Sequence, residues 1–540
     1  MVAAAFTARG VARAGEAHVG PVVNVVSAGS SAARFPDDLP GPQDEVVNDP
    51  PRVELPVVPA FTLPASEPGF HAPRELRVRG QALLGAELKV RGYVTWIYDC
   101  VAELERANPR AGRAQLEAAI EREPALCERP MFSLGDARDA SREASIWVVD
   151  APRSPGGAPA LAVGDYVVVT GAWGGASAID STATGVLAYK ALAHAAPGPA
   201  PALVSASPPE PPEIAIDTTV PLRAIVDTTI RNTSVDALNA CNRANARKQY
   251  DAALVSCRAA TTAWPDNHLA WYAAAGAHLA RAEWDQAVIA AERAVALRPD
   301  QAMYQLVHGM ALYEAERQRA RAAPIARRAR PSLDAARDAL VRATRLGPKL
   351  WRAHYYLGRV YRELDDARRA AEQLGAAITA HPRYRLGYIA LIELYRRWGY
   401  VDQALAVARL GTSHVATAEA GELWFEVAMV YEARRADREA LDALDHALAS
   451  RPDDASSKLQ RGQLYARRAD LASARRDLED AARSADPGAV AVRQVAARLL
   501  DELAGHDEPA GARCTRGCRV YRPSTQPYQP WTTEDAKYRF

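Results

Sequence analysis

Cysteine and histidine have the most reactive side chains in this chain, and their spacing matches no catalytic site. The six cysteines form three local pairs, Cys100/Cys127, Cys241/Cys257 and Cys514/Cys518. These spacings supply no tetrahedral metal site without further ligands. The motifs G-x-x-x-x-G-K-[ST], G-x-S-x-G, H-E-x-x-H and G-x-G-x-x-G are also missing from the sequence. We therefore expect no enzyme, no metal site and no cofactor.

Arginine supplies most of the remaining polar chemistry. The chain has 66 basic and 65 acidic residues and a net charge of +1. Such a balance argues against a dedicated nucleic-acid binder, which carries a basic excess. One local exception is ERQRARAAPIARRARP, with arginines between Arg317 and Arg330. This stretch either meets an acidic partner, phosphate or nucleic acid, or is a solvated extension.

A repeat between about Val235 and Leu503 determines how these side chains are positioned. Two alanines seven residues apart precede a proline in five copies: Ala253/Ala260/Pro265, Ala287/Ala294/Pro299, Ala336/Ala343/Pro348, Ala370/Ala377/Pro382 and Ala440/Ala447/Pro452. Two weaker copies, at Ala404/Gly411 and Ala474/Ala481, bring the total to seven. Successive prolines lie 34, 49, 34 and 70 residues apart. A period of 34 predicts a solenoid of helical hairpins, in which alanines two turns apart share a closely packed face.

A helix with large residues is expected ahead of each alanine pair, most clearly at Leu357, Gly358 and Tyr361. Together with the alanines and proline, this resembles the tetratricopeptide repeat (TPR) family, with its pattern W-x2-L-G-x2-Y, A, a bulky residue, A and P. The resemblance covers half of the chain. It implies a right-handed superhelix of seven hairpins at residues 233–505, closed by a capping helix at AVAVRQVAARLLDELAG.

The family register places Cys241 on the first helix of repeat one and Cys257 on the second. The two are therefore expected to touch. They are either two buried small residues or a disulfide, and a disulfide would imply an oxidising compartment.

In the TPR family the first helices line a concave groove that holds a peptide or a partner helix. The resemblance therefore implies a partner-binding site at Tyr272, Leu306, Met310, Tyr313, Arg352, Tyr355, Arg359, Arg362, Arg396 and Phe425. This order, apolar and then arginine-rich, favours a partner with an apolar anchor followed by acidic residues. Alternatively, the apolar members are buried against neighbouring repeats. Replacing Arg359 and Arg396 by glutamate is expected to abolish capture of an acidic partner and to leave the thermal midpoint nearly unchanged.

Residues 76–195 have the pattern of a β-barrel with a helical insertion. In GAELKVRGYVTWIYD, the residues Leu88, Val90, Val94 and Trp96 alternate with polar ones. The five expected strands and the phrase VGDYVVVTG are similar to an OB-fold. Cys100 and Cys127 bound the insertion at the ends of neighbouring strands, where a disulfide is plausible. OB-folds stack bases on exposed aromatics, and Tyr93 is the one candidate here.

The expected fold class is thus multidomain α+β, with an OB-like barrel and an all-α TPR solenoid. Residues 1–75 are expected to form a disordered or extended arm and residues 506–540 a disordered tail. The proline-rich stretch 196–232 is expected to be a linker that holds the two domains apart.

The function expected from these features is a scaffold or adaptor that binds a protein or peptide partner. A nucleic-acid-associated protein and a subunit of an envelope or secretion assembly are the alternatives. No stretch reaches the length of a transmembrane helix, so a cytoplasmic location is expected, or a periplasmic one if an export signal precedes the first methionine. The sequence leaves the partner and the oligomeric state open.

Overall fold

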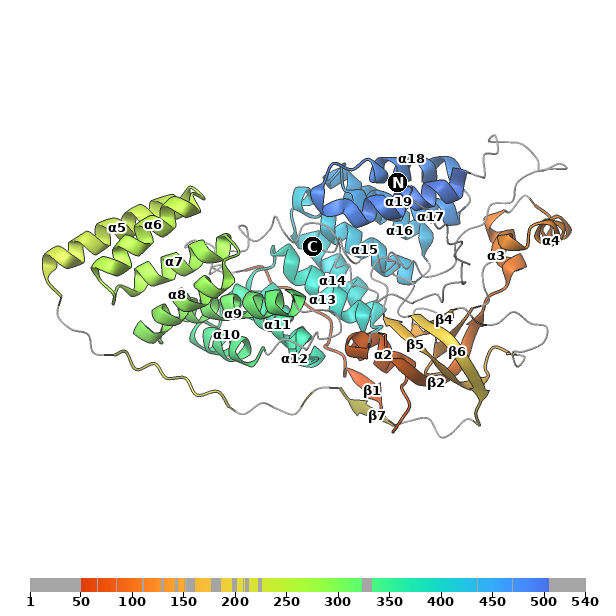
Figure 1. Ribbon diagram of the computed structural model, residues 1–540, viewed down its shortest axis with the longest axis horizontal. Helices are drawn as coiled ribbons and strands as arrows, with labels where there is room; N and C mark the ends of the chain where they lie inside the picture. The colour runs from red at the N-terminus through yellow and green to blue at the C-terminus, as the bar shows by residue number, and fades with distance from the viewer. Residues whose placement is uncertain are drawn as a thin grey trace, which may run out of the picture.

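The computed structural model describes residues 50–504, apart from residues 66, 84, 109–110, 128–130, 141–143, 150, 152–160, 176–185, 197–201, 207, 209–212, 222–225, 323–332, 435 and 469. Figure 1 shows two parts, a stack of helical hairpins running from α5 to α19 and a β-barrel beside it. The expected arm up to residue 49 and the expected tail from residue 506 lie outside the described residues.

Seven helical hairpins follow one another in the second half of the chain, as predicted. They are α5 (Thr228–Ala246) with α6 (Tyr250–Ala263), α7 (His268–Ala280) with α8 (Trp284–Leu297), α9 (Ala302–Ala322) with α10 (Asp334–Leu346), α11 (Trp351–Glu363) with α12 (Ala367–Ala380), α13 (Arg385–Arg397) with α14 (Val401–His414), α15 (Gly421–Ala433) with α16 (Asp437–Ser450), and α17 (Ala455–Arg467) with α18 (Leu471–Ala482). The predicted capping helix is α19 (Val490–Ala504), whose Val492, Val495 and Ala496 share a core with the last hairpin.

Small residues bring the two helices of each hairpin together. Both alanines of all five complete copies are buried. Glycine takes the closest position on the first helix: a Cβ atom at Gly358 would lie 2.7 Å from Cγ of Leu374, on the partner helix α12. A Cβ at Gly309 would lie 2.5 Å from Cγ of Leu340 on α10 in the same way. The sequence pattern thus specifies how closely the helices pack, as well as where they begin and end.

The third repeat is 15 residues longer than the period of 34, as the spacing of 49 between Pro299 and Pro348 shows. Part of this extra length extends the helix α9. Two of its arginines on this helix are already paired. Arg317 contacts Glu314 at 3.2 Å and Glu363 at 3.3 Å, and Arg319 contacts Asp285 at 2.6 Å. The side chains of the other four arginines lie outside the described residues.

The five strands of the barrel close in the order β2-β3-β4-β6-β5, with β5 returning to β2. They are β2 (Glu87–Ile97), β3 (Phe132–Gly135), β4 (Ile146–Val149), β5 (Tyr166–Gly175) and β6 (Val186–His194). The pair β4–β6 is parallel and the other four pairs are antiparallel. This is a Greek-key order, and it agrees with the predicted OB-like barrel.

The inward face of β2 differs from the prediction at one residue. Leu88, Val90 and Val94 lie in the barrel core as expected. A β-bulge between Val94 and Trp96 breaks the alternation, and Trp96 instead packs against Trp147 with ring centroids 5.2 Å apart. A bulge adds one residue to a strand and so moves the following side chains to the other face.

The insertion between β2 and β3 forms its own small unit. It contains α3 (Cys100–Ala107), α4 (Arg113–Arg122) and a short 3-10 helix at Pro124–Leu126, and a disulfide joins Cys100 to Cys127. Leu104, Leu116, Ala119 and Leu126 form a core separate from that of the barrel. A second disulfide joins Cys241 on α5 to Cys257 on α6, so these residues are more than two buried small side chains.

The structure corrects the predicted separation of the two domains. The strand β1 (Thr62–Pro64) lies within the expected arm and pairs with β7 (Leu203–Ser205) of the expected linker. The helix α2 (Pro73–Arg79) then leads into the barrel, and Arg397 of α13 donates to the carbonyl of Val78 at 2.7 Å. The linker therefore doubles back to the arm, and α2, which leads into the barrel, contacts the fifth repeat directly.

Across the described ranges, no helix is both long and apolar enough to cross a membrane. In the same part of the chain, no three His, Cys, Asp or Glu side chains group in a way that would hold a metal ion.

Candidate functional site

The ten predicted partner-binding residues all lie on the first helices of repeats two to six. We call the surface that these helices share the first-helix face. Five of the ten are partly exposed there: Tyr272 on α7, Arg359 and Arg362 on α11, Arg396 on α13 and Phe425 on α15. The tyrosine ring stacks on Tyr304 of the next first helix, with centroids 4.9 Å apart.

The structure buries the other five predicted residues. Leu306, Met310 and Tyr313 of α9 have no exposed surface, and Arg352 and Tyr355 of α11 are also buried. Their burial agrees with the packing alternative, and contact with a partner at these five positions stays a prediction. The physical reason is that α9 and α11 pack mainly against the second helices on either side of them, as well as against neighbouring first helices.

Arg359 is surrounded by aromatic rings rather than open to a ligand. Its guanidinium lies 5.0 Å from the ring centroid of Tyr313, 5.5 Å from that of Tyr355 and 5.3 Å from that of Tyr356. Cation–π contacts of this kind are strongest where water is excluded. Burial also raises the pKa of the Tyr313 hydroxyl, which donates to Glu363 at 2.6 Å. Arg359 thus packs on the tyrosines of the solenoid core and keeps 16% of its side-chain surface exposed.

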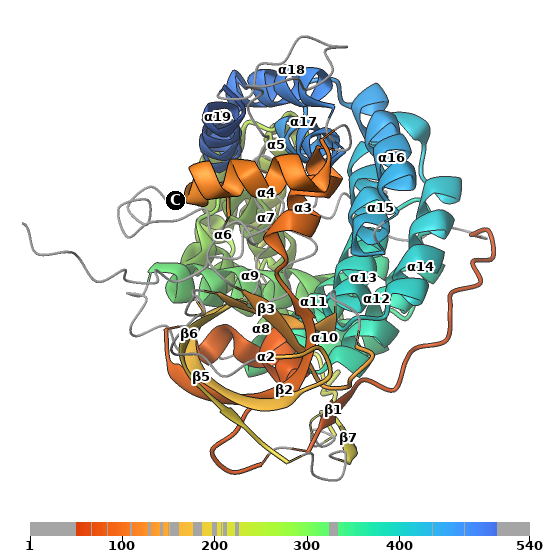
Figure 2. The same cartoon turned by 90° about the vertical axis from the view of Figure 1, so that its right-hand side faces the viewer.

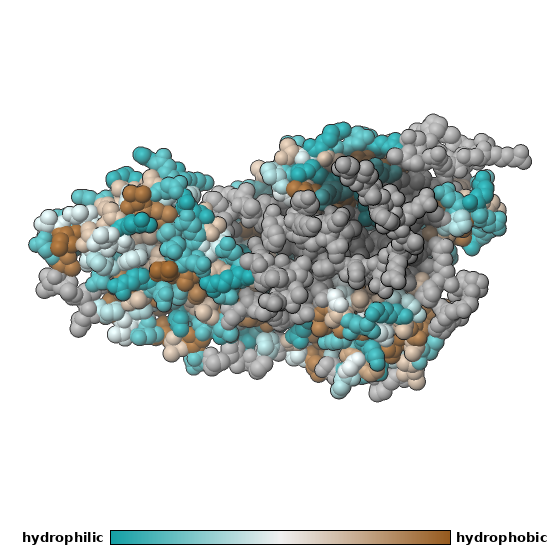
Figure 3. All heavy atoms as spheres, in the orientation of Figure 1, coloured by the Kyte–Doolittle hydropathy of each residue, from teal (hydrophilic) through white to brown (hydrophobic). Residues whose placement is uncertain are grey.

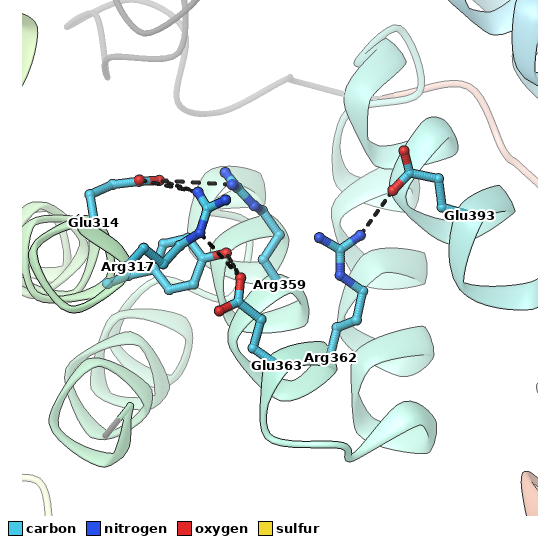
Figure 4. A network of polar contacts seen from close by, with 7 residues as sticks. Glu314, Arg317, Arg359, Arg362, Glu363 and Glu393 are labelled. Atoms are coloured by element: carbon cyan, nitrogen blue, oxygen red, sulfur yellow. Dashed lines mark hydrogen bonds and ion pairs between the residues drawn. The ribbon is translucent and has the colours of Figure 1, made fainter. Parts of the chain in front are cut away.

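The arginines of the middle repeats are neutralised by the chain itself. Arg359 faces Glu314 at 3.8 Å and Arg362 faces Glu393 at 3.0 Å, each on a neighbouring first helix (Figure 4). The series continues with Arg396 and Glu426 at 3.3 Å, and with Arg467 and Glu432 at 2.5 Å. An acidic partner would have to compete with these carboxylates. The arginine-rich middle therefore binds successive repeats to one another.

Glu426 is the most perturbed carboxylate in this series. It is almost completely buried, and burial raises its pKa from 4.5 to about 7, although Arg396 opposes the shift. A carboxyl group removed from water favours its neutral form. Arg396 therefore offsets the effect of burial only in part, and Glu426 takes up a proton as the pH falls through about 7. The expectation that charge reversal at Arg359 and Arg396 would leave the thermal midpoint unchanged does not fit these contacts.

Aliphatic side chains at the N-terminal end of the same face were not predicted. Val235 on α5 is 38% exposed and Leu269 on α7 is 49% exposed. They lie 34 residues apart, and Met303 on α9 follows after another 34, so the three occupy one register position. Hydrophobic residues, in brown, lie among hydrophilic ones on the visible surface of this end of the molecule (Figure 3). The signal in the sequence was this 34-residue repeat of aliphatic residues.

The aromatic candidate on the barrel also has neighbours. The ring of Tyr93 lies 4.6 Å from that of Tyr166, and the guanidinium of Arg138 lies 5.6 Å from its centroid. Tyr93 is half-buried in this group. Base stacking by Tyr93 is untested and stays a prediction.

The second half of the chain has seven helical hairpins with a sequence period of 34. Their alanine pairs are buried, and glycine and leucine bring paired helices into close contact. The second half of the chain is a tetratricopeptide-repeat solenoid. No family model matches the chain, and no curated protein matches it.

Several solved TPR structures are similar to parts of the solenoid. A tetratricopeptide repeat protein from Parabacteroides merdae is 14% identical, with a TM-score of 0.37, over 50% of this chain and 98% of that one. PilF of Pseudomonas aeruginosa is 15% identical, with a TM-score of 0.35, over 44% and 100%. A thermophilic TPR protein of Thermus thermophilus is 25% identical, with a TM-score of 0.31, over 37% and 99%.

Proposed function

We propose that the TPR solenoid is a protein-binding scaffold that captures an extended segment or a helix of a partner protein on its first-helix face. The observation that carries the proposal is the exposed aliphatic row of Val235 and Leu269, beside the partly exposed ring of Tyr272. Exposed apolar side chains arranged in a row on a protein surface mark an interaction site.

Rigid helices would make this capture efficient. The helices that carry the row pack closely through buried alanines, among them Ala270, Ala273 and Ala277 of α7. A preformed surface loses little conformational entropy on binding, so more of the apolar burial appears as affinity. The apolar anchor would come first, and any acidic residues of the partner would then reach the partly exposed Arg362 and Arg396.

Paired aspartate substitutions in the full chain test this assignment. Leu269→Asp places a charge in the row, whereas Ile289→Asp places one on the second helix α8, where Ile289 is 56% exposed. Tagged protein would be used to capture partners from a lysate of the source organism, with quantification by mass spectrometry. We expect a partner that Ile289→Asp retains and Leu269→Asp loses by at least about tenfold, since a buried unpaired charge is costly. Equal capture by the two variants would contradict the first-helix face as the site.

The disulfides favour a second, compatible candidate, a subunit of an envelope or secretion assembly. Cys100–Cys127 and Cys241–Cys257 are both joined. Disulfides persist in oxidising compartments and are rare in the cytosol. We therefore propose an oxidising compartment in place of the cytoplasm.

Thiol labelling in the source organism tests this location. Cells would be lysed in acid and the protein unfolded and alkylated without reductant. We expect Cys100, Cys127, Cys241 and Cys257 to remain unlabelled until a reductant is added. Alkylation of these four cysteines before reduction would contradict the oxidising compartment and favour the cytoplasm.

A further inference from the structure

The segment before β1 lies on the solenoid in an extended conformation. Residues 50–61 form no helix or strand, and Val53, Leu55 and Val58 pack against the solenoid core. Val57 points away and is 88% exposed. The segment also contains Pro50, Pro51, Pro56 and Pro59. Its inward side chains lie two or three residues apart, and its prolines give it the low conformational freedom of a proline-containing peptide ligand.

The solenoid surface beneath this segment is shaped to receive it. Gly375 on α12 leaves room for Leu55, whose Cδ1 would lie 3.3 Å from a Cβ at that position. Phe61 is almost completely buried among three aromatic rings. Its centroid lies 6.2 Å from that of Tyr395, 5.0 Å from that of Trp398 and 5.4 Å from that of Tyr400.

A backbone feature places two of those rings. Gly399, between Trp398 and Tyr400, has a φ of +77°, a conformation that other residues rarely adopt. The turn between α13 and α14 thereby brings both rings to the same phenylalanine. We call the surface made by Gly375, Tyr395, Trp398 and Tyr400 the arm site.

We propose that repeats four and five of the TPR solenoid carry a second peptide-binding site, the arm site, whose ligand is residues 53–61 of this chain, and that its occupancy holds the barrel on the solenoid. The site uses a second helix, α12, the last turn of the first helix α13, and the turn between α13 and α14. It contains none of the residues assigned to the first-helix face, so the proposal does not depend on the function assigned to that face.

The connection to the barrel is continuous with the bound segment. Phe61 and Leu63 share one buried cluster with Val78 of α2, Ala206 beside β7 and the solenoid residues. The barrel keeps a separate core of its own. The buried contacts that join the two domains are thus made by the arm, α2 and the β1–β7 ribbon. Figure 2 shows β1 and β7 together at the point where the arm reaches the barrel.

Two arginines form hydrogen bonds across this junction, each to the helix on the opposite side. Arg397 of α13 donates to the carbonyl of Val78 in the last turn of α2, at 2.7 Å. Arg74 of α2 donates to the carbonyl of Trp398, the C-cap of α13, at 3.5 Å and to the hydroxyl of Tyr400 at 3.1 Å. Each guanidinium thus lies at the negative end of the other helix. Two of the groups that contact Phe61 also receive these bonds, so occupancy of the arm site and docking of the barrel are coupled.

A matched pair of variants of the full chain tests the site. Leu55→Asp charges an inward side chain, and Val57→Asp charges its outward neighbour. We expect Leu55→Asp to speed hydrogen exchange in β1 and in the turn between α13 and α14, whose amides are hydrogen-bonded, by about tenfold or more, since exchange follows local opening. It should also increase the radius of gyration measured by small-angle X-ray scattering. Val57→Asp should match the wild type in both measurements. Identical behaviour of the two variants would overturn the proposal.

Gly375→Leu blocks the site from the solenoid side without changing the arm. It should reproduce the exchange and scattering of Leu55→Asp. Circular dichroism checks that each variant keeps its helices. If both variants exchange like the wild type, the arm is not held by this surface.

A peptide added in trans separates ligand binding from simple packing. A synthetic peptide of residues 50–64 is added in excess to the Leu55→Asp variant. We expect it to restore slow exchange around the turn between α13 and α14. The same peptide with Phe61→Ala should not restore it. Restoration by neither peptide, or by both equally, would show that no specific peptide site exists. The capture experiment with Leu269→Asp on the first-helix face does not depend on these results. Failure of the arm-site proposal can therefore be told apart from failure of the proposed scaffold function.

Discussion

The N-terminal repeats and the middle repeats of the solenoid are built differently, although they share one sequence pattern. The largest fully buried side chains of the solenoid are Tyr313, Tyr356, Tyr388 and Tyr395, all in repeats three to five. The buried residues of repeats one and two are mostly alanines, and the first hairpin is joined by Cys241–Cys257. The middle repeats gain stability from large rings and ion pairs, whereas the first two combine close helix packing with a disulfide and leave aliphatic side chains exposed.

Because of this difference, residues that stabilise the fold and residues proposed to bind a partner lie in different repeats of the first-helix face. In the middle, Arg359 and its neighbours have partners within the chain. At the N-terminal end, Val235 and Leu269 have exposed surface without charge. Substitutions in the middle should therefore affect folding first, and substitutions at the N-terminal end should affect partner capture first.

The largest expected effect comes from Arg359. Arg359→Met removes one of the two arginines that pair with Glu314 and leaves Arg317 as the other. It also removes the cation that lies over three tyrosine rings. We expect the free energy of unfolding to fall by about 3 kcal/mol, because one partner of a buried pair is lost. Arg368→Met is the control, since Arg368 pairs with Glu372 in an exposed i,i+4 contact worth at most about 0.5 kcal/mol. Urea denaturation measures both. Equal losses would show that the middle network is no more than surface charge.

The next effect is a pH dependence at Glu426. Its pKa is raised from 4.5 to about 7 in the folded protein, so the folded state holds the proton more tightly than the unfolded state. The associated stability is complete below pH 4.5 and is lost as the pH rises through 7. Relative to Glu426→Gln, the wild type should lose on the order of 2 kcal/mol over this window. Parallel stability curves for the two proteins between about pH 4.5 and 8 would contradict the shift.

The smallest effect compares two glycines. Gly358→Ala would push a Cβ against Leu374, and we expect a loss of about 1–2 kcal/mol from overpacking. Gly276 on α7 has nothing within 4 Å of its Cβ position. Gly276→Ala should therefore stabilise α7 by about 0.5–1 kcal/mol through helix propensity alone. Thermal unfolding of the two variants should move in opposite directions.

The repeat could be predicted from the sequence because its information is local. Alanines seven residues apart and the proline after them specify five hairpins, weaker copies specify two more, and all seven are present. The barrel strands were predicted for the same reason, from alternation within each strand. Trp96 was assigned to the wrong face because a bulge changes the alternation without a sequence signal.

The site was harder to predict because it depends on depth and on distant pairs. The register shows which face of a helix Leu306 or Met310 occupies, but it does not show how far the next repeat covers that face. Arg362 and Glu393 are 31 residues apart in sequence, so their pairing emerges only when neighbouring repeats stack. The docking of Phe61 has no periodic signal at all.

The disulfide-bonded insertion has a consequence for how this protein can change over evolution. The strands β2 and β3 are already joined at its base, where the amide of Tyr98 donates to the carbonyl of Met131 at 2.9 Å. The helices α3 and α4 have their own core and stand apart from the barrel (Figure 1). The insertion is therefore an interchangeable module: a lineage can lengthen, replace or delete it while the parent barrel keeps its strand pairing, and sequence drift should be fastest there.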